Sequence, residues 1–403
     1  MSELASESAS SGGGMSELRD LELAHAVRGL CDEWAYWREL ATAEAMEKHT
    51  SQIEAITSLL GAALAEVPEL ADPFERVLDL HHVWDFFRAK LLLRQVEPLR
   101  RILDVADELA WAVYHRAVDG RLKEPPLVFL DRGAVPFAAA RGVSYRDLLP
   151  RGVRTRSGVE AVRGLPVPVI GMPWFLTGHL PGVLLVAHEA GHHVEDDCGL
   201  TAELPGALAG LDPAAVARWE PWLGEAFADV VASVACGAAY RQVLAGAIGA
   251  GDGAGAADYP PPAARIELCH GATEDQGDGE AARVGRALAT FAYAGLGGRS
   301  LRDVLTHPDV ARAPSGAAGL LRGLGSGLTD VRAVLSAAAL AFLTGPAGYD
   351  TFKVGPRAVD EVLALRPRGP RHRDGGGDAT RARDVAAVGA LMRALSEPDP
   401  AVS

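Results

Sequence analysis

The spacing of apolar residues predicts long amphipathic helices in the first third of the chain. Between Leu21 and Leu40, apolar side chains recur near the helical repeat, and charged residues fill the gaps. Prolines that suit the first turn of a helix predict two more helices, over residues 73–96 and 98–118. We therefore expect a helical bundle over residues 17–122. The alternative is an arm through which these helices bind a protein partner.

The pattern changes to short apolar runs after residue 123. The runs Leu127–Leu130 and Val167–Met172 are predicted strands. Pro168 favours an edge position for the second strand, because proline cannot donate to a sheet ladder. Apolar helices are predicted over residues 181–196 and 221–245. The expected fold class is therefore α+β, predominantly helical, with a small sheet flanked by helical regions on both sides.

The same pattern predicts the limits of the domains. Residues 1–16 are rich in Ser, Glu and Gly and are expected to form a disordered tail. Residues 123–300 are expected to form a central domain. Residues 301–403 are expected to form a C-terminal helical region with a basic, Gly/Pro-rich linker near residues 366–379. Further helices are predicted at about residues 279–296, 329–344 and 380–396.

Charge and composition narrow the classes of partner. The formal net charge is −14, which argues against nucleic acid as the main partner, because a surface that binds phosphates is normally basic. The four cysteines are scattered without a CxxC pair, so neither a disulfide framework nor a cysteine-only zinc site is expected. The N-terminus lacks a secretory signal, and no uncharged run approaches the ~20 residues of a membrane span. We expect a cytoplasmic protein with no membrane span.

The predicted helix over residues 181–196 carries a His-Glu-x-x-His sequence. His188 and His192 are four residues apart, so both imidazoles project from one helix face and can reach one zinc ion. Glu189 follows the first histidine and is angled toward a metal-bound water. It can take a proton from that water and later deliver it to a leaving amine. The apolar run before His188 would bury one side of the helix and hold the ligands rigidly.

A catalytic zinc site usually has three protein ligands and leaves a position for water. A longer HExxHxxGxxH motif is excluded, because Glu195 and Cys198 stand at its two later positions. Glu195 lies on nearly the same helix face, but a solvated turn suits it better than a place beside the metal. The better third ligand is Glu225, four residues before Asp229 on the helix over residues 221–245. Asp229 could then accept the outer ring N–H of a zinc-binding histidine and fix its tautomer.

These two motifs, HExxH followed on a later helix by ExxxD, resemble those of the gluzincin metallopeptidases. The resemblance covers roughly residues 125–270 and implies a zincin-like sheet over the HExxH helix, with one Zn2+ per chain. The 33 positions between His192 and Glu225 exceed the gap in thermolysin-like enzymes, as an inserted loop would explain. The resemblance implies that His188, His192 and Glu225 are the zinc ligands. It further implies that Glu189 is the general base and that Asp229 supports a zinc-binding histidine.

A second similarity lies in the segment Tyr259-Pro-Pro-Pro-Ala-Ala-Arg265-Ile. This segment is similar to the His-Pro-Pro…Arg-Ile segment of the CAAX prenyl endopeptidase-like gluzincins, although tyrosine replaces their histidine and their membrane helices are absent. The similarity implies that Arg265 pairs with an active-site carboxylate and that Tyr259 donates a hydrogen bond to the oxyanion. His179 is a second candidate for that donor. The alternative is that the prolines start a helix and Arg265 is a structural ion-pair partner.

The sequence therefore predicts a zinc metallopeptidase that hydrolyses peptide or protein substrates with a metal-activated water. In such an enzyme an extended peptide pairs with the edge strand of the sheet, here predicted to be Val167–Met172. One alternative is a degenerate metal-binding scaffold that binds a partner, and another is a metal-dependent hydrolase of a non-peptide amide or ester. The intact Glu189 argues against a scaffold, because a purely structural site needs no base.

Overall fold

The computed structural model describes residues 7–65, 73–118, 123–141, 162–249, 259–274 and 277–371, with side chains from residue 17 onward. Helices make up most of this part of the chain, and three strands form one mixed sheet. The predicted class, α+β and predominantly helical, is confirmed. The chain divides into two compact units. The first is Met1–Leu92 with Arg141–Val167 and Gly369–Ser403, and the second is Leu93–Ala140 with Pro168–Arg368.

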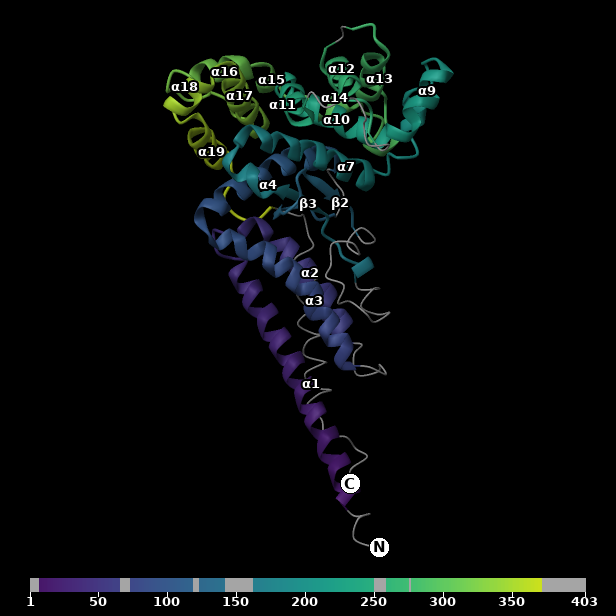
Figure 1. Cartoon of the computed structure of the whole chain (residues 1–403), viewed down its shortest axis with the longest axis vertical. Helices are drawn as coiled ribbons and strands as arrows, with labels where there is room; N and C mark the ends of the chain where they lie inside the picture. Colours follow the sequence, from purple (N-terminus) through teal and green to yellow (C-terminus); the bar gives the residue numbers. More distant parts are fainter. Residues whose placement is uncertain are drawn as a thin grey trace. The chain divides into compact units, whose positions relative to one another are not determined.

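The first unit contains three helices that contact one another, α1 (Glu7–Leu40), α2 (Thr50–Ala65) and α3 (Pro73–Leu92), with the short 3-10 helix η1 (Glu47–His49) before α2 (Figure 1). Trp37 of α1 and Trp84 of α3 meet edge to face, with ring centroids 5.7 Å apart. The Glu33 carboxylate accepts hydrogen bonds from the Trp84 indole and from Arg88. These apolar and polar contacts join α1 to α3.

The start of α1 differs from the sequence prediction. The helix begins at Glu7, inside the segment 1–16 that the sequence predicts to be a disordered tail, and residues 1–6 lie outside the described part. The helices expected over residues 73–96 and 98–118 are α3 and α4 (Glu97–Val118), separated by the 3-10 helix η3 (Leu93–Gln95). In the structure α4 belongs to the second unit, where it contacts the sheet.

The sheet has the order β1-β3-β2, formed by β1 (Leu127–Asp131), β2 (Phe137–Ala139) and β3 (Val169–Pro173). β1 runs parallel to β3, and β2 runs antiparallel to it. The prediction that Val167–Met172 forms the edge is therefore wrong, since β3 is the central strand. Pro168 stands just before the strand and its carbonyl accepts the N–H of Leu127 at 2.9 Å, so the ladder loses no donor.

Side chains cover the outer edge of β1. The N–H of Val128 donates to Asp107 at 3.0 Å, and the carbonyl of Val128 accepts from Arg94 at 2.8 Å. Arg94 and Asp107 also pair with each other at 2.6 Å, and both are buried. β2 is thus the strand at the other edge of the sheet. Its Phe137 ring fills the space beside Gly171 of β3, where a Cβ atom would lie 2.1 Å from the ring.

The HExxH sequence lies on α7 (Val186–Cys198), which follows the 3-10 helix η5 (Leu180–Leu185). α7 contacts β2, β3 and α4, and it packs closely against α10 (Leu223–Cys236) (Figure 1). Gly191 makes the close approach of α7 and α10 possible, because a Cβ atom there would lie 2.9 Å from the Cα atom of Ala228. The Nε2 atom of His193 lies 3.1 Å from the carbonyl oxygen of Val169 and joins the helix to the sheet.

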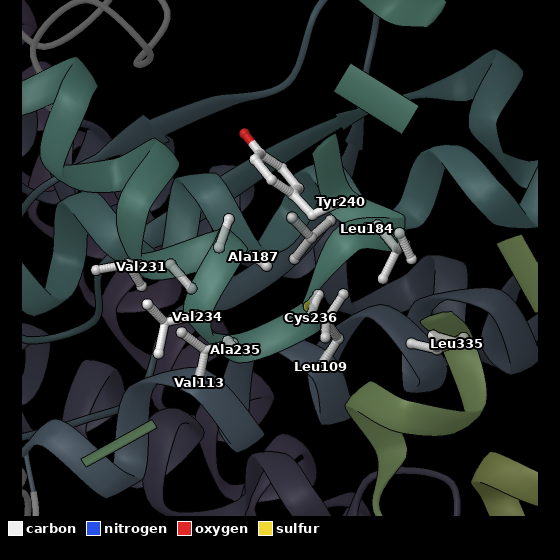
Figure 2. Packing of buried hydrophobic residues seen from close by; sticks show 14 of the residues in the cluster. Leu109, Val113, Leu184, Ala187, Val231, Val234, Ala235, Cys236, Tyr240 and Leu335 are labelled. Carbon is white, nitrogen blue, oxygen red and sulfur yellow. The ribbon is translucent and has the colours of Figure 1, made fainter. Parts of the chain in front are cut away.

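A hydrophobic core packs against the sides of α7 and α10 that do not carry the predicted ligands. Its members come from α4, η5, α7, α10 and the later helix α17 (Val331–Thr344), and they are almost completely buried (Figure 2). Among them Figure 2 labels Leu109, Val113, Leu184, Ala187, Val231 and Leu335. Burying apolar area of this kind is the main source of folding free energy, at roughly 25 cal/mol per Å². The core therefore holds rigid the two helices that carry the predicted ligands.

The single helix predicted over residues 221–245 is divided at Gly237. α10 ends at Cys236, and α11 (Ala238–Ile248) begins after a glycine with φ 66° and ψ −156°. Only glycine adopts this conformation without strain. The break turns α11 so that Tyr240, at its start, comes back to the side of α10 that carries Asp229.

The rest of the second unit is helical. α12 (Pro262–Thr273) and α13 (Glu280–Thr290) pack through two glycines, since a Cβ atom on Gly271 or Gly285 would meet the facing backbone within about 2 Å. The remaining elements are η4 (Trp174–Gly178), α8 (Leu204–Ala207), α9 (Pro213–Trp219), η6 (Glu220–Trp222), η7 (Ala294–Leu296), α14 (Leu301–Leu305), α15 (Pro308–Ala311), α16 (Ala313–Leu320), α18 (Pro346–Thr351) and α19 (Val354–Leu365).

The C-terminal predictions are described only in part. The helices expected at 279–296 and 329–344 correspond to α13 with η7 and to α17. The helix expected at 380–396, and the basic linker from residue 372 onward, lie outside the described residues. Arg366, at the start of that linker, pairs with Asp104 of α4 at 2.6 Å. Among the described helices, none is both long enough and apolar enough to cross a lipid bilayer.

Candidate metal centre

Three potential ligands from two helices meet at one point. His188 and His192 project from α7, and Glu225 projects from the first turn of α10. The His188 Nε2 atom lies 3.1 Å from Glu225 Oε2, and the His192 Nε2 atom lies 3.5 Å from Glu225 Oε1. One ligand atom from each residue falls within 4.8 Å of the other two, so the group could hold a metal ion.

The chemistry of these atoms suits a divalent metal ion. Two imidazoles and a carboxylate are a common protein ligand set for zinc, with bonds of about 2.0–2.2 Å. Glu225 contacts each histidine with a different carboxylate oxygen, at 3.1 and 3.5 Å, so the three side chains already surround one point. The sequence prediction of a metal-binding group at these three residues therefore matches the geometry.

Asp229 lies behind His188, one turn after Glu225 on α10. Its Oδ1 atom is 2.8 Å from His188 Nδ1, and the residue is fully buried. Arg265 of α12 donates to both of its carboxylate oxygens, at 2.7 and 2.9 Å. Burial alone would raise the pKa of Asp229, but the charges and hydrogen bonds of His188 and Arg265 outweigh it and hold the pKa far below its ordinary value. The carboxylate is therefore ionised and acts only as an acceptor.

Tyr240 is a member of this group that the sequence reading missed. Its hydroxyl donates to Asp229 Oδ1 at 2.6 Å and lies 3.4 Å from His188 Nδ1. The tyrosine follows the break at Gly237 by three residues, and it belongs to neither sequence motif. Its place beside Asp229 depends on how α11 turns back on α10. The signal that could have found it is the glycine inside an otherwise continuous apolar helix pattern, which marks a possible change of direction.

Glu189 is buried beside the ligands, with 7% of its surface exposed. Burial raises the pKa of Glu189, while the charges of His188 and His192 lower it and offset part of the effect. These interactions place the carboxyl group in the electrostatic field of the same two histidines. Glu189 is therefore a buried carboxyl group close to the two histidines.

Tyr259 and Arg265 come together as a stacked pair. The guanidinium carbon of Arg265 lies 5.1 Å from the centre of the Tyr259 ring, and Tyr259 remains 38% exposed. Burial of the ring raises the pKa of Tyr259, and the charges of Glu225 and Glu189 raise it further. The phenol is therefore near both carboxylates and keeps its proton. The predicted pairing of Arg265 with a carboxylate is present, and that carboxylate is Asp229.

Two other residues lie differently from expectation. Glu195 is buried rather than solvated, and its carboxylate accepts the hydroxyl of Thr201 at 2.9 Å. The turn after α7 folds back over this carboxylate, which the helix pattern could not indicate. The His179 ring packs edge to face on Phe342 of α17, with centroids 5.1 Å apart. A role for His179 beside the metal ligands therefore has no contact in the described residues to support it.

Comparisons with protein-family models, with curated proteins and with solved structures found no match to this chain.

Proposed function

We propose that the chain is a zinc-dependent peptidase of the gluzincin type. The single observation that carries this proposal is the convergence of His188, His192 and Glu225 from two helices, with an acid–base residue, Glu189, directly beside the first ligand. A site that only stabilised the fold would use its ligands alone. The buried carboxyl group beside them supports a hydrolytic centre.

The residues of the site divide the work of hydrolysis among them. A zinc ion held by the three ligands supplies a Lewis acid and lowers the pKa of water. Glu189 accepts the proton of the water that attacks the scissile carbonyl and then delivers it to the leaving amine nitrogen. Asp229 holds the ring of His188 through the 2.8 Å contact at Nδ1, which directs Nε2 toward the metal position. No covalent bond between protein and substrate forms.

The surroundings of the site favour an extended peptide as substrate. Tyr259 is protonated, partly exposed and held in place by Arg265, so its hydroxyl is suited to donate to the oxyanion. Among the described strands β2 lies at an edge and contacts α7, and an extended peptide can add to such an edge through its main chain. The sequence predicted that Val167–Met172 binds the substrate as an edge strand. We propose instead that β2, Phe137–Ala139, is the strand that binds it.

The test combines metal analysis with hydrolysis. Purified wild type is expected to bind about one zinc ion per chain, and Glu225→Ala is expected to lose it. Zinc-loaded wild type is then assayed against a mixture of internally quenched peptides. Glu189→Gln should retain zinc and lose activity by about 100-fold or more, because proton transfer contributes 10²–10⁴-fold.

Glu195→Gln is the matched control, because it makes the same change at another buried glutamate of α7 and should retain activity. If Glu189→Gln cleaves peptides as fast as wild type, the proposed mechanism is wrong. Cleavage of non-peptide amides or esters, without any cleavage of peptides, would show that the protein is a hydrolase of another class.

A further inference from the structure

The side chain of Tyr240 joins the hydrophobic core to the metal centre. Its ring is fully buried and packs with the cluster that includes Leu184 and Ala187. Figure 2 shows that its hydroxyl points away from the other labelled side chains of that cluster. The hydroxyl instead donates to Asp229 Oδ1 at 2.6 Å. The core thus fixes the ring of Tyr240, and the hydroxyl group holds the carboxylate of Asp229.

The carboxylate of Asp229 receives four donor contacts. Oδ1 is approached by the Tyr240 hydroxyl at 2.6 Å, by His188 Nδ1 at 2.8 Å and by an Arg265 Nη2 atom at 2.9 Å. Oδ2 accepts the Nε–H of Arg265 at 2.7 Å. Three of these contacts converge on Oδ1 and one on Oδ2, and because they come from three different elements they fix the orientation of the carboxylate. In that orientation Oδ1 faces Nδ1 of His188.

We propose that Tyr240 is a positioning residue of the metal centre. Acting through Asp229, its hydroxyl holds the imidazole of His188 in the tautomer and orientation that present Nε2 to the metal. The inference rests on the metal centre of the proposed function and extends it to a residue outside both motifs.

The position of the hydroxyl explains why it matters. Arg265 approaches the carboxylate through both oxygens, and without Tyr240 it would be the stronger of the two remaining partners. Asp229 could then turn toward Arg265 and lengthen its contact with His188. Groups that orient a metal ligand from behind are worth about 10–100-fold in metal affinity. A tyrosine that only filled space in the core would have no such effect.

The chain offers a matched control for a purely structural role. Tyr293 is also fully buried, and its hydroxyl donates to the carbonyl of Leu288 at 2.9 Å. Tyr240→Phe and Tyr293→Phe therefore remove the same atom from two buried rings, and each leaves one acceptor with one donor fewer. Both variants keep the ring, so both should fold.

The first measurement is the affinity for zinc, by competition with a chelator in the metal-free protein. Tyr240→Phe should bind zinc about tenfold more weakly than wild type, and Tyr293→Phe should remain within about twofold. Equal affinity of Tyr240→Phe and wild type would overturn the inference. An equal loss in both variants would also overturn it, because the effect would then follow from general loosening of the core.

The second measurement is independent of metal. The ring nitrogen signals of His188 in the metal-free protein are recorded by NMR and assigned by their loss in His188→Gln. In wild type Nδ1 should carry a proton that is hydrogen-bonded to Asp229, and in Tyr240→Phe the Nδ1 signal should shift or broaden. If wild type binds no zinc, the proposed function fails, and this measurement still decides the role of Tyr240. An unchanged His188 signal in Tyr240→Phe would refute that role.

Discussion

Gly191 of α7 lies against the backbone of Ala228 of α10, so closely that a methyl group on Gly191 would come within 2.9 Å of the Ala228 Cα atom. Gly191 is one of the two variable positions inside the HExxH sequence, and Ala228 stands between Glu225 and Asp229. This close contact is therefore flanked by His188 and His192 on α7 and by Glu225 and Asp229 on α10. A wider helix spacing would move Glu225 away from the histidines.

Gly191→Ala should therefore weaken both folding and metal binding. Overpacking of this kind costs about 1–3 kcal/mol, which chemical denaturation can measure, and zinc content reports the ligand geometry. Gly246→Ala is the control, because this glycine of α11 has open space where the methyl group would be. That variant should be neutral or slightly more stable, since alanine favours the helix. Unchanged stability and zinc content in Gly191→Ala would show that the close approach is not needed.

Removal of the metal should lower the stability of the wild-type protein. A ligand that binds only the folded state stabilises it by about 2.7 kcal/mol at a free concentration of 100 times its Kd. Thermal unfolding with and without a chelator measures this difference, and zinc added back should restore it. Glu225→Ala lacks one of the three ligands, so the chelator should not change its midpoint. A chelator shift of wild-type size in Glu225→Ala would place the metal elsewhere.

Loss of Arg265 should destabilise the protein strongly. Arg265→Met leaves the carboxylate of Asp229, which is fully buried, without its only guanidinium partner among the described residues. Removing one member of a buried ion pair costs about 3–5 kcal/mol. Arg218→Met, which breaks an exposed pair with Glu280, should change the unfolding free energy little. Similar effects of the two substitutions in urea unfolding would contradict the importance of the Asp229 pair.

Asp330 should make the C-terminal helices sensitive to acid. It caps α17 by accepting the backbone N–H of Arg332 at 2.9 Å, and it also pairs with the Arg332 guanidinium. His307 and Arg116 face the same carboxylate at 3.8 and 4.0 Å. Burial raises the pKa of Asp330, but the contacts with Arg332 outweigh it and hold the pKa below its ordinary value of 3.8.

Because the pKa of Asp330 is lowered in the folded state, its contribution to stability is complete above the ordinary value and disappears as pH falls through the folded value. Asp330→Asn keeps the side-chain acceptor and removes the titration. Wild type should be the more stable protein in urea near pH 6, and this advantage should shrink below about pH 4. A difference that stays constant down to pH 3 would exclude this role of Asp330.

Local periodicity predicted the long helices α1, α3, α4, α7, α10 and α17 and the two residue pairs of the site, but it did not predict α2 or α19. His188 and His192 share a face because four residues nearly complete one helical turn, and the same rule relates Glu225 to Asp229. That the two pairs meet depends on tertiary packing, which local periodicity does not encode. The resemblance to a known motif pair suggested it, and the packing at Gly191 achieves it.

The failures arise where the chain reverses direction or where a short segment depends on its neighbours. β2 has only three residues, so its pattern carries little information until it pairs with β3. Pro168 indicated an edge strand, but it precedes the strand and contributes only its carbonyl. Tyr240 reaches Asp229 only because Gly237 redirects the chain, and no repeat in the sequence relates the two residues.

The ion pair on the outer side of β1 bears on how the protein avoids self-association. Exposed strand edges are templates on which other molecules can stack into aggregates. A foreign strand could dock at β1 only by displacing Arg94 and Asp107 from Val128 and exposing two buried charges. Among the described strands, the β1 edge is therefore closed to a further strand by a buried ion pair, and such protection lowers the tendency of a sheet to associate with other chains.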